Sequence, residues 1–206
     1  VVTGFRLSRG GAQERFNIKP DLTTMAKILA GGLPGGAVGG KAEIVDMIQH
    51  RGEPEWDNQK RVSHNGTFNA NPLCAIAGSI CLELIAKEPI NEMADLMANK
   101  LRYGLNETLM KMEVPGVAYG ISSLVLLSFG VESNPQEVWK IPHDILNSAA
   151  KPGTRPAFKR AMINEGVDTM GGRGFIVSAV HTEKEIDRTI EAFEKTLVNM
   201  RQDGIV

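Results

Sequence analysis

A glycine-rich run that begins shortly after Lys27 constrains this chain more than any other feature. Six of the ten residues from 31 to 40 are glycine. Glycine adopts positive φ without a steric penalty, and it lets a bulky ligand lie directly against the backbone. A solvated surface lysine does not need such neighbours. We therefore interpret Lys27 as a candidate covalent anchor for a carbonyl cofactor, because a lysine amine can form a covalent bond with a carbonyl group.

Composition narrows the classes of function. The chain has 206 residues, of which 42% are hydrophobic and 23% charged, which is typical of a globular protein with one large domain or two small ones. A net charge of -1 argues against nucleic acid or an anionic membrane as the main partner. Neither the two cysteines nor the four histidines have metal-ligand spacing. No apolar run is long enough to cross a membrane and no signal peptide opens the chain, so we expect a cytoplasmic protein.

A second informative stretch runs from His64 to Pro72, just before a strongly helical segment. Gly66 and Thr67 offer a backbone amide and a hydroxyl that could bind a phosphate oxygen. A turn followed by a helix cap explains the same residues, because Asn and Thr are favoured there. Taken together with Lys27, the stretch favours a cofactor that carries both an aldehyde and a phosphate.

A nucleotide-binding phosphate loop is the nearest rival interpretation. Residues Gly35 to Lys41 match the spacing G-x-x-x-x-G-K. The motif requires a Ser or Thr hydroxyl at the next position to hold Mg²⁺, and Ala42 stands there instead. The nucleotide interpretation is therefore the weaker one.

The pattern of the chain predicts an α/β protein with a boundary near Pro89. The first part, 1–88, is glycine-rich and carries Lys27, whereas 89–206 forms a smaller strand-and-helix domain. Val1–Arg6 is typical of the end of a strand. Apolar periodicity, with a Thr182–Glu185 capping box, predicts the following elements. Helices are expected at 42–50, 72–87, 90–112, 156–165 and from 183, and strands at 117–119, 124–129 and 175–180. Loops are expected at 51–61 and 132–155, the second with one helical turn.

Several motifs together resemble the class III aminotransferases. They occur in order along nearly the whole chain: Val1–Arg6, Pro20–Thr24 with Lys27, Gly31–Ala37, Gly66-Thr67 with Asn71–Leu73, and Val180–Glu183 with Glu185–Asp187. The branch of glutamate-1-semialdehyde aminomutases is the most similar. The resemblance implies the fold-type I architecture of PLP-dependent transferases, with 1–88 as part of the large domain and 89–206 as the C-terminal α+β small domain. It also implies pyridoxal 5'-phosphate and a homodimer with shared active sites.

The resemblance assigns roles to individual residues. Lys27 matches the family's Schiff-base lysine. Thr67, beside Gly66, matches the threonine that binds the cofactor phosphate from the neighbouring subunit. Arg173, flanked by glycines before a strand, is suited to bind a substrate carboxylate through two parallel hydrogen bonds, although a surface ion pair explains it equally well. The implied substrate is a small amino acid or amino aldehyde.

Two alternatives remain open at this stage. His64–Asn69 and Gly172–Phe175 are similar to the β-amino-acid aminotransferase branch of the family. Val1 is not an initiator methionine, and the family's aspartate that pairs with the pyridine nitrogen lies just before its counterpart. We therefore expect the chain to be the C-terminal portion of a longer enzyme, inactive alone. A non-catalytic structural or dimerising role is the alternative from a different class.

Overall fold

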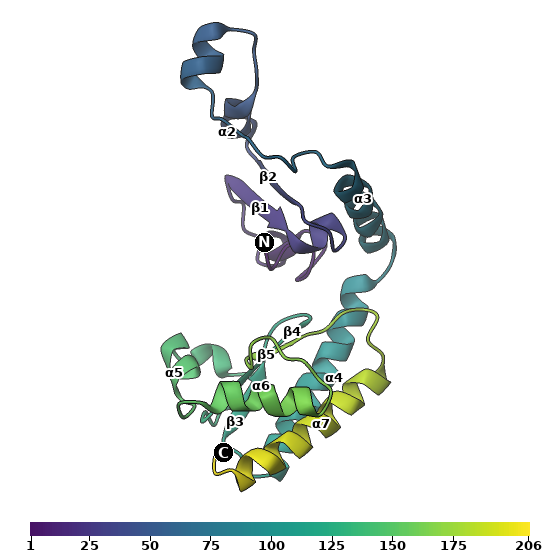
Figure 1. The fold of residues 1–206 in the computed structure, drawn as a ribbon, viewed down its shortest axis with the longest axis vertical. Helices are drawn as coiled ribbons and strands as arrows, with labels where there is room; N and C mark the ends of the chain where they lie inside the picture. Colours follow the sequence, from purple (N-terminus) through teal and green to yellow (C-terminus); the bar gives the residue numbers. More distant parts are fainter. The chain divides into compact units, whose positions relative to one another are not determined.

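The computed structural model describes all residues from 1 to 206 and divides into two compact units. Unit 1 comprises Val1–Pro89 and unit 2 comprises Ile90–Val206. Figure 1 draws unit 1 in purple to dark teal and unit 2 in teal to yellow. The units are described separately below.

Unit 1 contains one β-hairpin, one long helix and several short helical turns. Its elements are α1 (Gly11–Arg15), β1 (Leu22–Ala26), the 3-10 turn η1 (Lys27–Ala30), β2 (Gly36–Gly40), α2 (Ala42–Val45), the 3-10 turn η2 (Asp46–Ile48), the π-helical turn η3 (Trp56–Lys60) and α3 (Pro72–Lys87). Few of its apolar side chains are buried; Leu7, Ala30 and Ile85 are the ones with little exposure. The unit therefore relies on close backbone packing more than on a hydrophobic core.

The glycine-rich run forms the second strand of the hairpin. β1 and β2 are antiparallel, with Ala26 opposite Gly36 and Leu22 opposite Gly40. A Cβ atom added at Gly40 would collide with the Asp21 carbonyl oxygen, so this position requires glycine. The ion pair between Lys41 Nζ and Asp21 Oδ1, at 2.5 Å, lies at the same end of the hairpin. The segment that matched a phosphate loop is thus a paired strand, and the phosphate-loop interpretation is wrong.

The first residues are not a strand, contrary to the expectation for Val1–Arg6. The backbone turns instead: the Arg6 and Leu7 amides both donate to the Thr3 carbonyl oxygen at 3.3 Å, and Phe5 has φ of 57°. The terminal amine of Val1 donates to the Thr24 carbonyl oxygen of the hairpin at 3.1 Å. A strand needs regular pairing along its length, whereas these amides bond within the turn itself.

Helix α3 begins and ends as predicted, but its apolar stripe does not pack within the unit. The side chains that form the stripe are exposed: Leu73 at 65%, Ile76 at 57%, Ile80 at 52% and Leu84 at 46%. The helix instead packs through Gly78 and Ile85, which are buried. A helix that is apolar on nearly every side offers more than one face for packing, so periodicity alone did not identify the face used here.

Unit 2 is an α+β domain built on a three-stranded antiparallel sheet in the order β3-β4-β5. Its elements are α4 (Ile90–Lys111), β3 (Gly116–Tyr119), β4 (Leu124–Phe129), the 3-10 turn η4 (Val138–Lys140), α5 (His143–Ser148), α6 (Thr154–Asn164), β5 (Gly174–Ile176) and α7 (Glu183–Gln202). In register, Val117 lies opposite Ser128, and Leu124 lies opposite Ile176.

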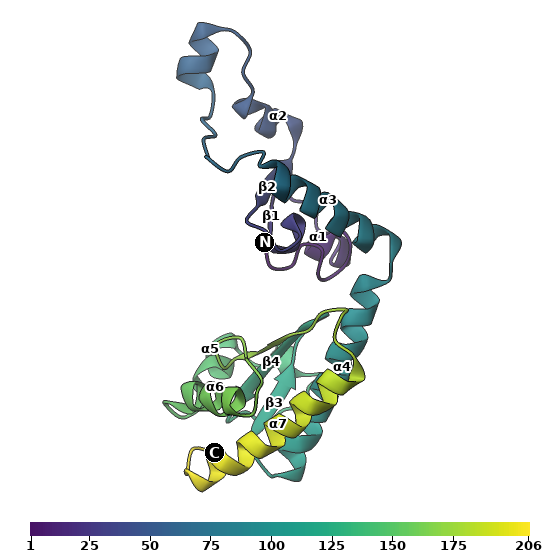
Figure 2. The same cartoon turned by 45° about the vertical axis from the view of Figure 1, so that its right-hand side comes forward.

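The two faces of this sheet pack against different helices. Alternate β4 residues, Val125, Leu127 and Phe129, join the main core with α4, α6 and α7, as the period of two in a strand dictates. A smaller cluster on the other side includes Val117, with side chains from η4 and α5. Figures 1 and 2 show α4 and α7 lying side by side. The sheet is therefore covered on both faces.

The predicted helices and strands of unit 2 are largely confirmed, with two differences. The expected 132–155 loop contains η4 and α5, and α6 begins at Thr154. β5 ends at Ile176, before the end of the expected strand. The capping box is present, since the Thr182 amide donates to Glu185 Oε2 at 2.8 Å. No helix is long and apolar enough to cross a membrane.

The aromatic centre of the unit 2 core gives a stability prediction. Phe158 is fully buried and makes edge contacts with Phe129 at 5.3 Å and Phe193 at 5.9 Å between ring centroids. Phe158→Ala should cost about 3–5 kcal/mol, because it removes buried apolar area and leaves a cavity. Met110→Ala, at a residue 76% exposed, should cost less than about 0.5 kcal/mol. Urea unfolding followed by circular dichroism measures both, and equal shifts would contradict the core described here.

Candidate functional site

Lys27 lies at the end of strand β1 in an unusual backbone conformation. Ala26 is fully extended, with φ of -163°, and Lys27 then has φ of 57° in the left-handed region. Such a conformation costs a residue with a Cβ about 1–3 kcal/mol and persists only where the surrounding structure enforces it. The Lys27 side chain is exposed, and its amine makes no hydrogen bond or ion pair. The chain thus holds the backbone of this lysine rigidly and leaves its nitrogen unpaired.

Helix α3 lies directly against the turn that carries Lys27. A Cβ atom added at Gly31, which has φ of 61°, would lie 2.5 Å from the Ala77 carbonyl oxygen. One added at Gly78 would collide with the Leu29 carbonyl oxygen. No role for Gly78 could be predicted from the sequence, because a glycine inside a helix does not reveal which segment approaches it.

Gly66 and Thr67 lie in a turn just before α3, and neither caps the helix. Asn71 is the cap: its Oδ1 accepts hydrogen bonds from the Leu73 amide at 3.0 Å and the Cys74 amide at 3.2 Å. The Thr67 hydroxyl is exposed and makes no hydrogen bond. Gly66 has a packing role of its own, since an added Cβ would lie 2.7 Å from Asn69 Oδ1. Asn71 is therefore the helix cap, and the Thr67 hydroxyl remains free to bind another group.

An open cavity of about 750 Å³ lies between these two turns and α3. Its wall includes Leu29 and Gly35 from the lysine hairpin, Phe68 and Asn69 from the Thr67 turn, and Cys74 from the helix. The volume falls in the range of about 300–1,000 Å³ that small-molecule sites occupy. Lys27 and Thr67 do not line the cavity, although residues adjacent in the chain do.

Arg173 lies in unit 2, in a turn whose backbone is closely held. Its amide donates to the Met170 carbonyl oxygen at 3.0 Å, and its carbonyl oxygen accepts from the Leu127 amide at 2.8 Å. A Cβ atom added at Gly172, which has φ of 71°, would collide with the Arg155 carbonyl oxygen. The Arg173 side chain is exposed and makes no ion pair. A fixed backbone with an unpaired guanidinium suits the binding of a carboxylate.

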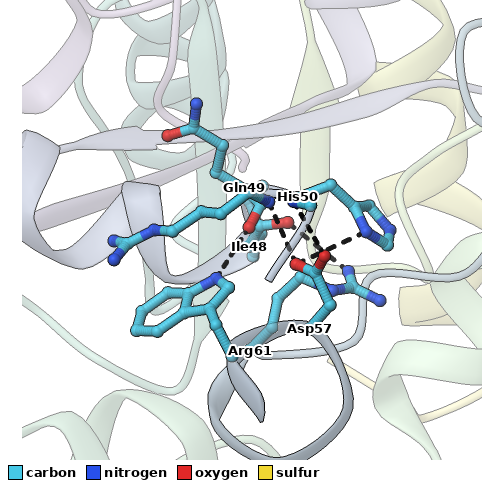
Figure 3. A network of polar contacts seen from close by, with 8 residues as sticks. Ile48, Gln49, His50, Asp57 and Arg61 are labelled. Atoms are coloured by element: carbon cyan, nitrogen blue, oxygen red, sulfur yellow. Dashed lines mark hydrogen bonds and ion pairs between the residues drawn. The ribbon is translucent and has the colours of Figure 1, made fainter. Parts of the chain in front are cut away.

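The densest polar network of unit 1 surrounds Asp57 and is shown in Figure 3. Asp57 accepts hydrogen bonds from the Arg51 and Gly52 amides, each at 3.0 Å. The Trp56 indole nitrogen donates to the Gln49 carbonyl oxygen at 2.9 Å, and the Arg51 guanidinium lies 3.5 Å from the Trp56 ring centroid. These contacts close the expected 51–61 loop on itself. The network has a structural role, since its acid is already occupied by backbone donors.

Comparisons with solved structures define the class of fold. An omega-transaminase from Sphaerobacter thermophilus is 28% identical with a TM-score of 0.77, covering 96% of this chain and 42% of that one. A beta-phenylalanine aminotransferase from Variovorax paradoxus is 25% identical with a TM-score of 0.74, covering 98% of this chain and 44% of that one. The fold is therefore that of fold-type I PLP-dependent transaminases, and the expected fold class is confirmed.

Comparisons of sequence identify the family. The class III aminotransferase model matches residues 1–154. The glutamate-1-semialdehyde 2,1-aminomutase of Thermomicrobium roseum is 35% identical over 204 residues, which cover 97% of this chain and 44% of that protein. The chain belongs to the class III aminotransferases, a family of PLP-dependent enzymes. It spans less than half the length of the curated relatives that it matches over nearly all of its own length.

The residues present suit pyridoxal 5'-phosphate. The cofactor requires an amine for its aldehyde and hydrogen-bond donors for its phosphate. Lys27 has an unpaired exposed amine, and Thr67 has an unpaired exposed hydroxyl. Open space also surrounds Gly32, where an added Cβ would meet no atom within 4 Å.

The Asp57 network predicts a pH-dependent local transition. The Arg51 amide, followed by the Gly52 amide and His50, lowers the pKa of Asp57 below its usual value. The stabilising effect is therefore complete above the unfolded pKa of about 3.9 and is lost as the pH falls through the folded pKa. In a Trp139→Phe background, Trp56 fluorescence should stay constant from neutral pH to about pH 4 and change below it.

Asp57→Ala is the matched variant for this transition. It removes both acceptor oxygens, so the fluorescence should already have its acid value at neutral pH and should lose the acid transition. Neutral-pH spectra identical to those of the parent would contradict the role given to Asp57.

Proposed function

We propose that this chain supplies the reactive lysine of a PLP-dependent amino-group transfer enzyme. The observation that carries the proposal is the unpaired amine of Lys27, on a strained left-handed residue in a member of this family. Once bound, the cofactor withdraws electrons from the carbon that bears the substrate amine. Lys27 would hold the cofactor, because its amine can condense with the aldehyde with loss of water.

Lys27 has a second task in this proposal. When its Nζ is free of the cofactor, Lys27 would be the base that takes the proton from the substrate carbon, holds it at Nζ and delivers it to C4' of the cofactor. A base must come within hydrogen-bond reach of that proton, so the direction of the side chain matters as much as its chemistry. The enforced φ of 57° at Lys27 restricts that direction.

Thr67, Gly66 and Arg173 bind the two anionic groups. The Thr67 hydroxyl and the Gly66 amide donate to the cofactor phosphate, from the neighbouring subunit of a homodimer in which the active sites are shared. The Arg173 guanidinium binds the substrate carboxylate through two parallel hydrogen bonds. These fix the orientation of the carboxylate and balance its negative charge. The exposed, unpaired state of Thr67 and Arg173 supports these roles.

For the substrate, we propose an amino aldehyde, transformed as by glutamate-1-semialdehyde 2,1-aminomutases, in the cytoplasm. Relatives of that name are 34–35% identical over nearly all of this chain. A β-amino-acid aminotransferase is the second candidate, supported by the structural similarity to the beta-phenylalanine aminotransferase. Both candidates use the same residues of this chain. Turnover of the two substrate classes distinguishes them.

A non-catalytic dimerising role is the alternative from a different class. It is supported by the exposed apolar face of α3, which includes Leu73 and Ile76. Such a protein would have no selective reaction with pyridoxal phosphate. Selective labelling of Lys27 by pyridoxal phosphate separates the two roles.

Replacing Lys27 with alanine should abolish selective incorporation of pyridoxal phosphate. The chain is incubated with pyridoxal phosphate, reduced with borohydride and digested, and the modified lysines are quantified by mass spectrometry. Lys27 should carry most of the label in the parent chain, because its enforced left-handed backbone fixes the direction of its amine. Lys87→Ala, which removes an exposed lysine paired with Glu83, is the control and should leave the label at Lys27 unchanged. Uniform labelling of all exposed lysines would refute the proposal.

Replacing Thr67 with valine should weaken the binding of pyridoxal phosphate but not of pyridoxal, which lacks the phosphate. Valine keeps the shape and removes the hydroxyl, and a hydrogen bond to a charged group contributes about 1.5–3 kcal/mol. The affinity for pyridoxal phosphate should therefore fall by about ten- to a hundredfold. Titration of both compounds measures the difference. Equal losses for the two would show that Thr67 does not contact the phosphate.

A further inference from the structure

The turn that carries Lys27 is strained. Ala26 is extended, Lys27 is left-handed, and the short 3-10 turn η1 ends at Gly31, which is left-handed again with φ of 61°. At the end of this turn the Gly31 amide donates to the Ile28 carbonyl oxygen at 3.0 Å. Strain at a residue with a Cβ persists only under external constraint. Something outside the turn must supply that constraint.

Helix α3 supplies it through two reciprocal backbone contacts. Gly78, which is buried in the helix, faces the Leu29 carbonyl oxygen, and Gly31 faces the Ala77 carbonyl oxygen. In each contact, a backbone carbonyl group of one segment lies against a glycine of the other, where a side chain would otherwise stand. The neighbouring Gly32 is also left-handed, with φ of 92°, but an added Cβ there would meet no atom within 4 Å. The close approach is therefore specific to Gly31 and Gly78.

Gly78 has no conformational reason to be glycine. It lies inside α3, where the backbone suits any L-residue, and alanine is the better helix former. Gly31, in contrast, requires glycine for both its φ and its contact. Glycine at position 78 therefore does not stabilise the helix. It allows the lysine turn to approach the helix closely.

We propose that Gly78 is a positioning residue for Lys27: its missing side chain lets α3 press against the Leu29 carbonyl and hold Lys27 in the left-handed conformation that directs its amine. This inference rests on the proposed function of Lys27. It makes Gly78, on helix α3, a second residue on which the reactivity of the Lys27 amine depends. A methyl group at Gly78 displaces the turn while leaving the amine of Lys27 intact and exposed.

The test is Gly78→Ala in the full chain, read as borohydride-trapped pyridoxal phosphate at Lys27. The rate at Lys27 should fall by up to about a hundredfold, since a displacement of about 1 Å can cost that much in a positioned reaction. Label at the other lysines of the same chain serves as the internal standard and should not change. Reductive methylation of Lys27 by formaldehyde should also keep its rate, because that small reagent needs only an accessible amine.

Gly104→Ala is the matched control. Gly104 is a buried glycine inside α4 of unit 2, where an added Cβ would collide with the Ile190 side chain. The variant has the same chemical change away from the lysine turn, although its added methyl meets a side chain that can shift and not a backbone carbonyl. It should leave the labelling of Lys27 at the parent rate. An equal loss in both variants would mean that general destabilisation causes the effect, and would overturn the proposal.

The outcomes separate the inference from the function on which it rests. Selective labelling of Lys27 in the parent, lost in Gly78→Ala alone, supports both. Selective labelling that survives Gly78→Ala overturns the positioning role and leaves the proposed function standing. A parent chain without selectivity for Lys27 refutes the proposed function itself.

Hydrogen exchange on the unaltered chain keeps the proposal testable if Gly78→Ala does not fold. If α3 holds the turn, the Gly31 amide should exchange as slowly as the interior amides of α3, since both open together. The Gly32 amide, which makes no backbone hydrogen bond, provides the fast reference. Exchange of Gly31 at the rate of Gly32 would overturn the positioning role.

Discussion

The backbone contact between the lysine turn and helix α3 is the constraint on which the arrangement of unit 1 depends. It fixes Leu29 and Ala30 against the middle of the helix, and these two residues form one wall of the cavity. The other wall belongs to the turn that precedes the same helix and ends at its cap, Asn71. One helix therefore determines the positions of both turns, and the separation of Lys27 from Thr67 within a subunit follows from its packing.

The strength of this contact comes from geometry and not from a large buried area. Two glycines face two carbonyl groups, so the backbones approach more closely than side chains would allow. Protein interiors are close-packed, and even one added methyl group is felt there. The lysine turn therefore cannot shift far and still keep its contact with helix α3. This explains how a unit with so few buried apolar side chains can maintain a left-handed Lys27.

Much of unit 2 could be predicted from the sequence, because its helices and strands have regular apolar periods. Leu101, Leu105 and Leu109 repeat at helical spacing in α4 and are all buried. In unit 1 the glycine run predicted that a ligand could lie against the backbone near Lys27, whereas the structure shows helix α3 against Gly31. The glycines could not indicate what approaches, because Gly78 lies far along the chain from Gly31. Sequence patterns report local geometry, whereas this contact depends on tertiary packing, and the roles of Lys27, Thr67 and Arg173 remain predictions.

The exposed face of α3 adds an energetic consequence. Leu73, Ile76, Ile80 and Leu84 each remain roughly half exposed, and full burial of such a side chain contributes about 1.5–3 kcal/mol. Covering the face would therefore add about 4 kcal/mol, close to a thousandfold in an equilibrium constant. Since α3 holds the lysine turn, whatever covers this face also stabilises the conformation of Lys27, by the linkage that couples binding to folding. A partner that covered this face would therefore also favour the close contact of α3 with the lysine turn at Gly31 and Gly78.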